Sequence, residues 1–136
     1  MNDISTADAM QYLENGIGLS AERYSGRPLS VATCDRNGDL MSFARVNGAK
    51  LLTVELTQRK ARTSARMGCT TRALGERVVR ENLDLAWFGD DHFTALPGGV
   101  PLVNAEGVVL GSVAVGGLSA TEDHECAELL SVSIAL

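Results

Sequence analysis

Histidine and cysteine, the side chains best suited to metal or covalent chemistry, are scarce in this chain. His92 and His124 are the only histidines, and the cysteines Cys34, Cys69 and Cys126 lie far apart. An odd number of widely spaced cysteines argues against a disulfide framework and against a zinc knuckle. The sequence therefore predicts no metal site. It leaves lysine, arginine and carboxylate groups to bind an anion or to move a proton.

One histidine lies in an acidic cluster. Glu122, Asp123 and Glu125 surround His124, and nearby carboxylates favour the charged imidazolium, which suits a general acid or base. The same cluster follows Ser119, and serine with glutamate three residues later is the pattern of a capping box at a helix start. Catalysis by Glu122 and His124 and plain helix capping therefore both remain open.

The double glycine Gly98-Gly99 lies between Pro97 and Pro101. Proline fixes φ on either side, whereas glycine can adopt backbone conformations closed to other residues, so the pattern predicts that something approaches this backbone closely. The N–H groups of Gly98 and Gly99 and the ammonium of Lys60 could together stabilise a developing oxyanion. The alternative is that the glycines only turn the chain.

Positive charge is concentrated in the middle of the sequence. Nine of the twelve cationic residues lie between Arg45 and Arg80, against two glutamates, so this segment carries +7 and the remainder −12. Such asymmetry indicates an anion site on the basic segment, or attraction between the halves within one chain or between subunits. On a helix, Arg59, Arg62 and Arg66 would form one cationic edge, although solvated arginines are the simpler interpretation.

Segment 83–96 is the least regular part of the sequence and holds Trp87, Phe88 and Phe93 together with His92. An aromatic loop of this composition is either a ligand lid or a cover on the core. We favour the cover, because large aromatic side chains are buried wherever there is room.

The elements that must position these groups follow from periodicity and turn signals. A helix begins at Ser5 and ends near Ser25-Gly26, and Asn37-Gly38 joins two strands in a hairpin. A small-residue stripe on the next helix predicts close packing against another backbone. The predicted elements are helix 5–25, strands 29–35 and 40–46, helices 50–68 and 72–82, strands 100–103 and 108–115, and helix 121–136. This order predicts an α+β fold with helices packed on an antiparallel sheet.

Composition bounds the class of protein. A chain of 136 residues with 45% hydrophobic and 21% charged residues predicts one soluble domain over 1–136. The N-terminus has no basic region and no apolar block, and no apolar run is long enough for a membrane helix, so we expect a cytoplasmic protein. The acidic net charge of −5 and the lack of aromatic residues along the basic helix disfavour nucleic-acid binding.

The order of these features resembles the GlcG/HbpS-like family over residues 7–130. The resemblance rests on Lys60-Ala61-Arg62-Thr63-Ser64-Ala65, on the loop Pro97-Gly98-Gly99-Val100-Pro101, and on the glycine-rich strand 111–117. It implies a profilin-like or PAS-like sandwich that assembles as a homo-oligomer, from a dimer up to an octamer. It also implies a small-molecule ligand, and heme for some members.

Three functions stay open on these observations. The first is a binding module for heme or another anionic planar ligand, with His92 or His124 as axial ligand and the three cysteines and four methionines as further candidates. Arg45, Lys60 and Arg66 would be the partners of the propionates. In this module Phe93, Gly98 and Gly99 would also contact the ligand. The second is a cofactor-free isomerase, tautomerase or lyase that uses Lys60, His124 and Glu122 on a small carboxylate or phenol. The third is a non-catalytic assembly subunit.

Overall fold

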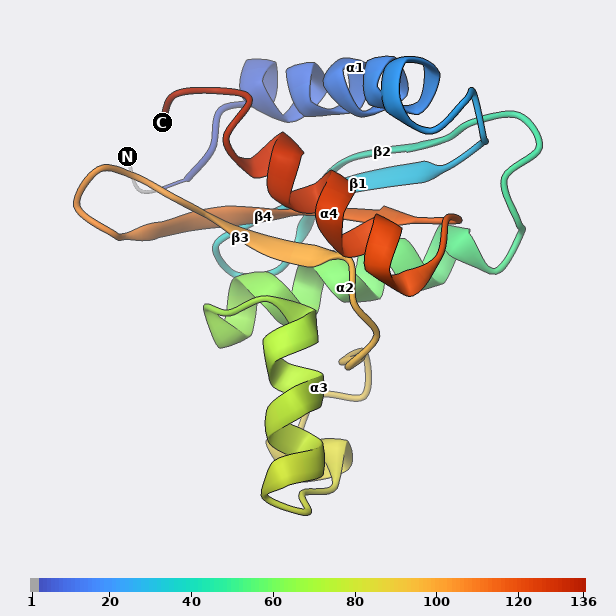
Figure 1. Cartoon of the computed structure of the whole chain (residues 1–136). Coiled ribbons are helices and arrows are strands. Elements are labelled where there is room, and N and C mark those ends of the chain that lie inside the picture. Colours follow the sequence, from blue (N-terminus) through green and yellow to red (C-terminus); the bar gives the residue numbers. More distant parts are fainter. Residues whose placement is uncertain (1–2) are drawn as a thin grey trace.

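The computed structural model describes residues 3–136, and its centre is a four-stranded antiparallel sheet of order β2-β1-β4-β3 (Figure 1). Two hairpins, β1-β2 and β3-β4, join through the central pair β1 and β4. The predicted α+β class and element order are confirmed. The elements are α1 (Thr6–Arg23), β1 (Ser30–Asp35), β2 (Leu40–Arg45), α2 (Thr53–Met67), α3 (Thr71–Arg80), the 3-10 helix η1 (Leu85–Phe88), β3 (Gly99–Val103), β4 (Val109–Gly116) and α4 (Ala120–Ser131).

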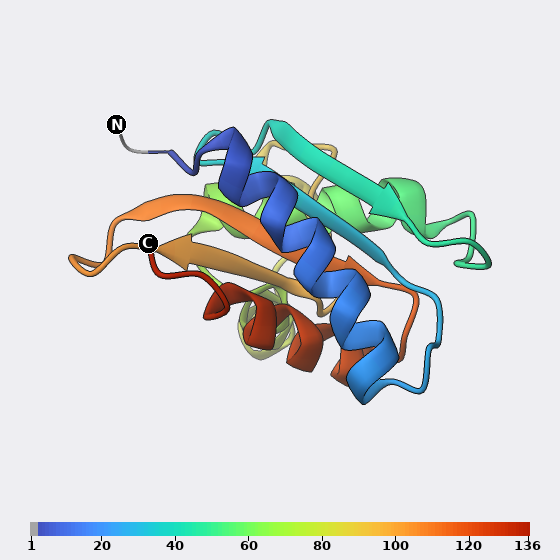
Figure 2. The same ribbon diagram turned by 90° about the horizontal axis from the view of Figure 1, so that it is seen from above.

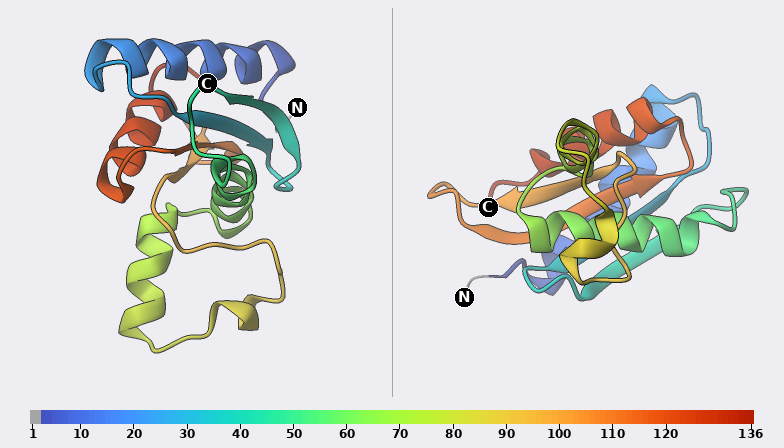
Figure 3. Two further views of the ribbon diagram at one scale, coloured as in Figure 1. Left: turned by 90° about the vertical axis from the view of Figure 1, so that its right-hand side faces the viewer. Right: turned by 90° about the horizontal axis from the view of Figure 1, so that it is seen from below.

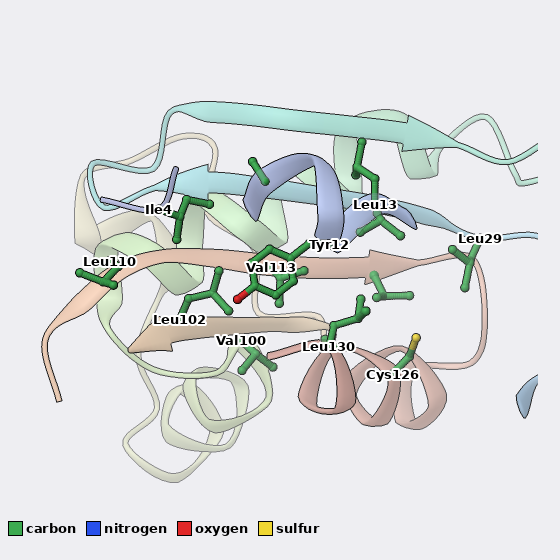
Figure 4. Packing of buried hydrophobic residues seen from close by; sticks show 14 of the residues in the cluster. Ile4, Tyr12, Leu13, Leu29, Val100, Leu102, Leu110, Val113, Cys126 and Leu130 are labelled. Carbon is green, nitrogen blue, oxygen red and sulfur yellow. The ribbon is translucent and has the colours of Figure 1, made fainter. Parts of the chain in front are cut away.

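Helices cover both faces of the sheet and make three layers. α1 and α4 lie on one face and α2 on the other (Figures 1 and 2). Tyr12 and Leu13 from α1 and Leu130 from α4 pack over Val113 in the main hydrophobic core (Figure 4). The central strands are therefore buried on both faces, which explains their nearly continuous apolar and small residues.

The face toward α2 is packed differently, because small residues bring helix and sheet close together. Ala61 and Ala65 of α2 are buried with Ala32, Cys34 and Ala114 of the sheet. The close packing predicted from small residues on this helix is thus confirmed. Leu51, which lies inside the predicted helix 50–68, precedes the observed helix and is exposed.

The structure corrects the end of the last helix and shows how the β1-β2 turn is held. α4 ends at Ser131 rather than at residue 136, and Val132, which lies inside the predicted helix 121–136, is exposed. In the β1-β2 hairpin only Gly38 has a positive φ, at +87°, whereas Asn37 does not. The Asp35 carboxylate accepts the N–H groups of Asn37 and Asp39 instead, which fixes the turn by side-chain hydrogen bonds.

Segment 71–98, which we call the excursion, leaves the three layers and returns to them (Figure 3). Its helix α3 projects away from the sheet, and Trp87 in η1 is 72% exposed. The prediction that the aromatic residues here cover the core is therefore wrong for Trp87. Among residues 3–136, no helix is both long enough and apolar enough to cross a membrane.

Candidate functional site

Lys60 occupies the most unusual environment in the described chain. It lies in the middle of α2, where β4 leads into α4 beside that helix (Figure 1). Its ammonium is buried, at 2% exposure, and donates to the Val115 carbonyl oxygen and to Oδ2 of Asp123, both at 3.1 Å. A buried lysine must be paired to stay charged, and here the partner carboxylate comes from the first turn of α4.

Asp123 is held in turn by the chain around it. Its Oδ1 accepts the N–H of Leu118 at 2.9 Å, and its Oδ2 accepts from Lys60. Burial raises the pKa of Asp123, and the ammonium of Lys60 and the bond from Leu118 oppose this rise. The carboxylate is therefore fixed in position, with both oxygens already hydrogen-bonded.

The double glycine is built around Lys60. A Cβ at Gly98 would lie 2.9 Å from Nζ of Lys60, and a Cβ at Gly99 would lie 2.4 Å from the Lys60 carbonyl oxygen. Gly98 also has a φ of +132°, and the N–H of Gly99 donates to the Thr71 hydroxyl at 3.0 Å. The close approach predicted for this loop is thus to α2, and the Gly99 N–H is not free for an oxyanion.

A small pocket opens beside this ion pair; we call it the Lys60 pocket. Lys60 and Asp123 line it, and its volume is about 180 Å³. Its remaining lining comes from the start of α2, from Leu96 and Pro97, and from the turn into α4: Lys50, Leu52, Thr53, Leu56, Leu96, Pro97, Gly117, Leu118 and Ala120. Mainly apolar walls therefore surround one ammonium and one carboxylate.

The other residues of the acidic cluster are placed elsewhere. Glu122 forms the predicted capping box with Ser119 and also pairs with Arg27; these bonds lower its pKa to about 2. His124 is buried, and its Nε2 lies 2.7 Å from Oε1 of Glu128, although neither ring nitrogen has a hydrogen-bond partner in the described chain. Neither Glu122 nor His124 lines the Lys60 pocket, so the structure does not bring them to Lys60.

A second pocket, the His92 pocket, lies on the opposite flank of α2. His92 lines it with Arg59 and Arg62, beside the β1-β2 turn, and its volume is about 270 Å³. The remaining lining residues are Cys34, Gly38, Asp39, Leu40, Glu55 and Gln58. The cationic edge predicted for α2 therefore meets the one histidine that is exposed.

Asp90 ties the excursion to that cationic edge. Its Oδ2 lies 2.9 Å from Nε of Arg62 and 3.3 Å from Nε of Arg66, and its Oδ1 accepts the N–H of His92 at 2.9 Å. The Arg59 guanidinium adds a bond to the Asp91 carbonyl oxygen at 3.0 Å. These contacts position His92 at its pocket.

The Asp90 contacts predict a measurable pH dependence. Burial favours a higher pKa for Asp90, but the His92 N–H and the two arginines outweigh it and lower the pKa below its usual value. A lowered folded pKa stabilises the fold above the unfolded value, and this stabilisation is lost as the pH falls through the folded pKa. In an NMR titration, we expect the His92 amide shift to change with a midpoint below the usual pKa of an aspartate. Asp90→Asn should abolish the change, and a midpoint at or above that value would contradict the described contacts.

Three further predicted residues lie outside both pockets. Arg45 is exposed at the far end of β2, where it donates to the Ala49 carbonyl oxygen at 3.2 Å. Phe93 packs near Phe88, with ring centroids 6.5 Å apart. Arg66 is held by Asp90 and the Asn37 carbonyl oxygen, next to the His92 pocket.

Sequence reasoning missed Asp123 and Asp90 as the organising carboxylates. In the sequence Asp123 stands out only as a neighbour of His124, yet as the fourth residue of a capped helix it points back toward the preceding loop. Asp90 lies in irregular chain, where no periodicity predicts direction. The only signal for it was its place between aromatic residues and His92.

Comparison with solved structures shows which proteins share this fold. The Streptomyces reticuli HbpS double mutant superposes with a TM-score of 0.86 at 23% identity, covering 98% of this chain and 88% of that one. The PduOC:heme complex gives a TM-score of 0.83 at 22% identity, covering 97% and 95%. The Klebsiella pneumoniae protein ORFY gives 0.83 at 19% identity, covering 96% and 92%.

Sequence comparison gives the family. No curated protein matches this chain significantly. The family model described as "Haem degrading protein HbpS-like", however, matches residues 4–130. This agrees with the resemblance carried by the Lys60 segment and the glycine loop. The chain therefore belongs to the HbpS-like family.

Proposed function

We propose that this protein binds heme, with the His92 pocket as the site. The observation that carries the proposal is that an exposed imidazole and two guanidinium groups line one pocket: His92 with Arg59 and Arg62. Heme needs an axial ligand and cations for its propionates. The family and the structural similarity to the PduOC:heme complex support the same ligand class.

The lining residues would have different roles in binding heme. His92 would supply the axial nitrogen, and Arg59 and Arg62 would pair with the propionates. Cys34 is a poor ligand, because burial raises the pKa of its thiol to about 12 and keeps it protonated. Bound heme would bring iron redox chemistry, whereas the protein groups hold and orient it.

The size of the pocket limits how the heme lies. Its volume of about 270 Å³ falls below the ~300–1,000 Å³ of pockets that enclose drug-sized ligands. We therefore expect one edge of the porphyrin to lie in the pocket and the remainder to lie against the surface around Leu40, which is exposed. Arg45 and Lys60, proposed from sequence as propionate partners, do not line this pocket, and Arg66 lies only beside it.

A hemin titration tests this site. The wild type should give a saturable Soret shift at one equivalent per chain, and His92→Ala should lose it because the axial ligand is gone. Arg59→Ala should keep the ligation band but weaken binding, since a propionate partner is lost.

Two matched variants serve as controls. His124→Gln removes the buried histidine, and Arg80→Ala removes an exposed cation on α3; both should titrate like the wild type, with folding checked by circular dichroism. A Soret shift that survives in His92→Ala, or that is lost in His124→Gln with the fold intact, would place the heme elsewhere.

Homo-oligomeric assembly from dimer to octamer and a cytoplasmic location stay predictions. So does the alternative of a cofactor-free enzyme on a small carboxylate or phenol. The catalytic groups proposed for that enzyme are Lys60, His124 and Glu122. Neither His124 nor Glu122 lines the pocket beside Lys60.

A further inference from the structure

We propose that the Lys60 pocket is a second binding site, separate from the heme site, and that it takes a short-chain carboxylate. The pocket lies on the flank of α2 toward α4, and Lys60 and Asp123 line it. The His92 pocket shares neither residue with it. The two sites can therefore be tested independently.

The ammonium of Lys60 keeps a hydrogen-bonding capacity that the protein does not use. A lysine ammonium has three N–H donors, and within residues 3–136 it has two acceptors, the Val115 carbonyl oxygen and Oδ2 of Asp123. Both oxygens of Asp123 already accept a bond. A ligand oxygen in the pocket can thus accept the third N–H without breaking the ion pair.

The surrounding chain is shaped to keep this ammonium in place. Side chains at Gly98 and Gly99 would collide with Nζ and with the carbonyl oxygen of Lys60, so both glycines are needed for its position. This arrangement costs free energy, because a lysine and an aspartate lose their hydration when they are buried. Apolar residues of similar volume often replace a buried ion pair with no loss of stability. Retention of the pair beside a pocket therefore points to a ligand.

Charge and lining select the class of ligand. Lys60 and Asp123 balance each other, and Lys50, exposed on the same lining, adds one positive charge. The walls are apolar, with Leu52, Leu56 and Leu118. The volume of about 180 Å³ is below the ~300–1,000 Å³ of pockets that enclose drug-sized ligands. An anion with a short apolar chain fits these limits.

The test uses propionate and pyruvate as probes of the intact chain. Binding is followed by isothermal titration calorimetry and by amide shifts of Leu118 and Ala120, with ethylammonium as the probe of opposite charge. We expect saturable binding of one or both carboxylates, shifts confined to the Lys60 pocket, and no binding of ethylammonium. Hemin-loaded and hemin-free protein should give the same result.

Ala120→Trp is the decisive variant, because it fills the pocket from the exposed start of α4 and leaves both charged residues in place. It should weaken carboxylate binding by roughly tenfold or more, equivalent to about 1.4 kcal/mol. Ala105→Trp, in the exposed β3-β4 turn, is the matched control and should bind like the wild type. Three outcomes would overturn the proposal: no binding of either carboxylate, binding that Ala120→Trp leaves unchanged, and preferential binding of ethylammonium.

Discussion

Replacing Lys60 by alanine should destabilise the fold by about 3–5 kcal/mol, the range measured when one partner of a buried ion pair is removed. The side chain of Asp123 is only 6% exposed and would lose its counter-charge. Its alternatives are to stay charged in the interior or to become protonated. Urea unfolding at pH 7, followed by circular dichroism, measures the change in the free energy of unfolding.

The pH dependence of this loss has a definite sign. Burial raises the pKa of Asp123 in the fold, and in Lys60→Ala the ammonium no longer opposes that rise. A raised folded pKa means that the folded chain binds more protons than the unfolded chain. The stability of the variant should therefore fall as the pH rises from about 3.9 through the folded pKa, so its deficit is larger at pH 7 than at pH 4.

Two controls separate charge from packing. Lys50→Ala removes an exposed lysine of the same helix region and should change stability by about 0.5 kcal/mol or less. The double variant Lys60→Met with Asp123→Leu removes both charges and should recover most of the loss. A double variant as unstable as Lys60→Ala would mean that the loss comes from packing rather than from the unpaired charge.

Gly98→Ala is the second substitution with a large expected effect, at about 2–5 kcal/mol. The φ of +132° strains any other residue, and the added Cβ would lie 2.5 Å from the Val115 carbonyl oxygen and 2.9 Å from Nζ of Lys60. Backbone strain of about 1–2 kcal/mol and overpacking of about 1–3 kcal/mol add up. Thermal and urea unfolding would measure the sum.

Gly107→Ala provides the matched control for this prediction. Gly107 also has a positive φ, +79°, but a Cβ there would meet nothing within 4 Å. It should therefore show the strain alone, about 1 kcal/mol. Equal losses at the two positions would show that Lys60 and Val115 move aside freely, and the glycine loop would then not hold the ammonium in place.

The elements were predictable because their signals are local. Ser5 and Ser119 accept the N–H three residues on and begin α1 and α4, as their spacing predicts. Ala61 and Ala65 pack against the sheet, as small residues at helical spacing predict. The prediction of helix ends failed where tertiary contacts determine them. Apolar residues continue beyond Ser131, yet Val132 has no neighbouring layer to bury it.

The candidate sites were predictable only in part, because they depend on which distant segments meet. Sequence singled out Lys60 and Gly98-Gly99, but nothing in it said that the glycines approach the lysine itself. Asp123 comes to Lys60 from 63 residues away, a distance that no spacing rule covers. His92 and Arg62 meet because irregular chain around Asp90 folds back on α2, and irregular chain carries no periodic signal.

The hydrogen bond between the Gly99 N–H and the Thr71 hydroxyl closes the excursion at its base. A second set of bonds holds its return limb to α2, through Asp90 and through the Thr94 N–H to the Thr63 hydroxyl. A protease cut at the exposed tip, near Asn82, would therefore leave two fragments that stay associated. Because these bonds hold the base of the excursion, a longer or shorter tip does not move the strands that flank it. Insertions and deletions at the tip should therefore be tolerated in evolution without altering the sheet.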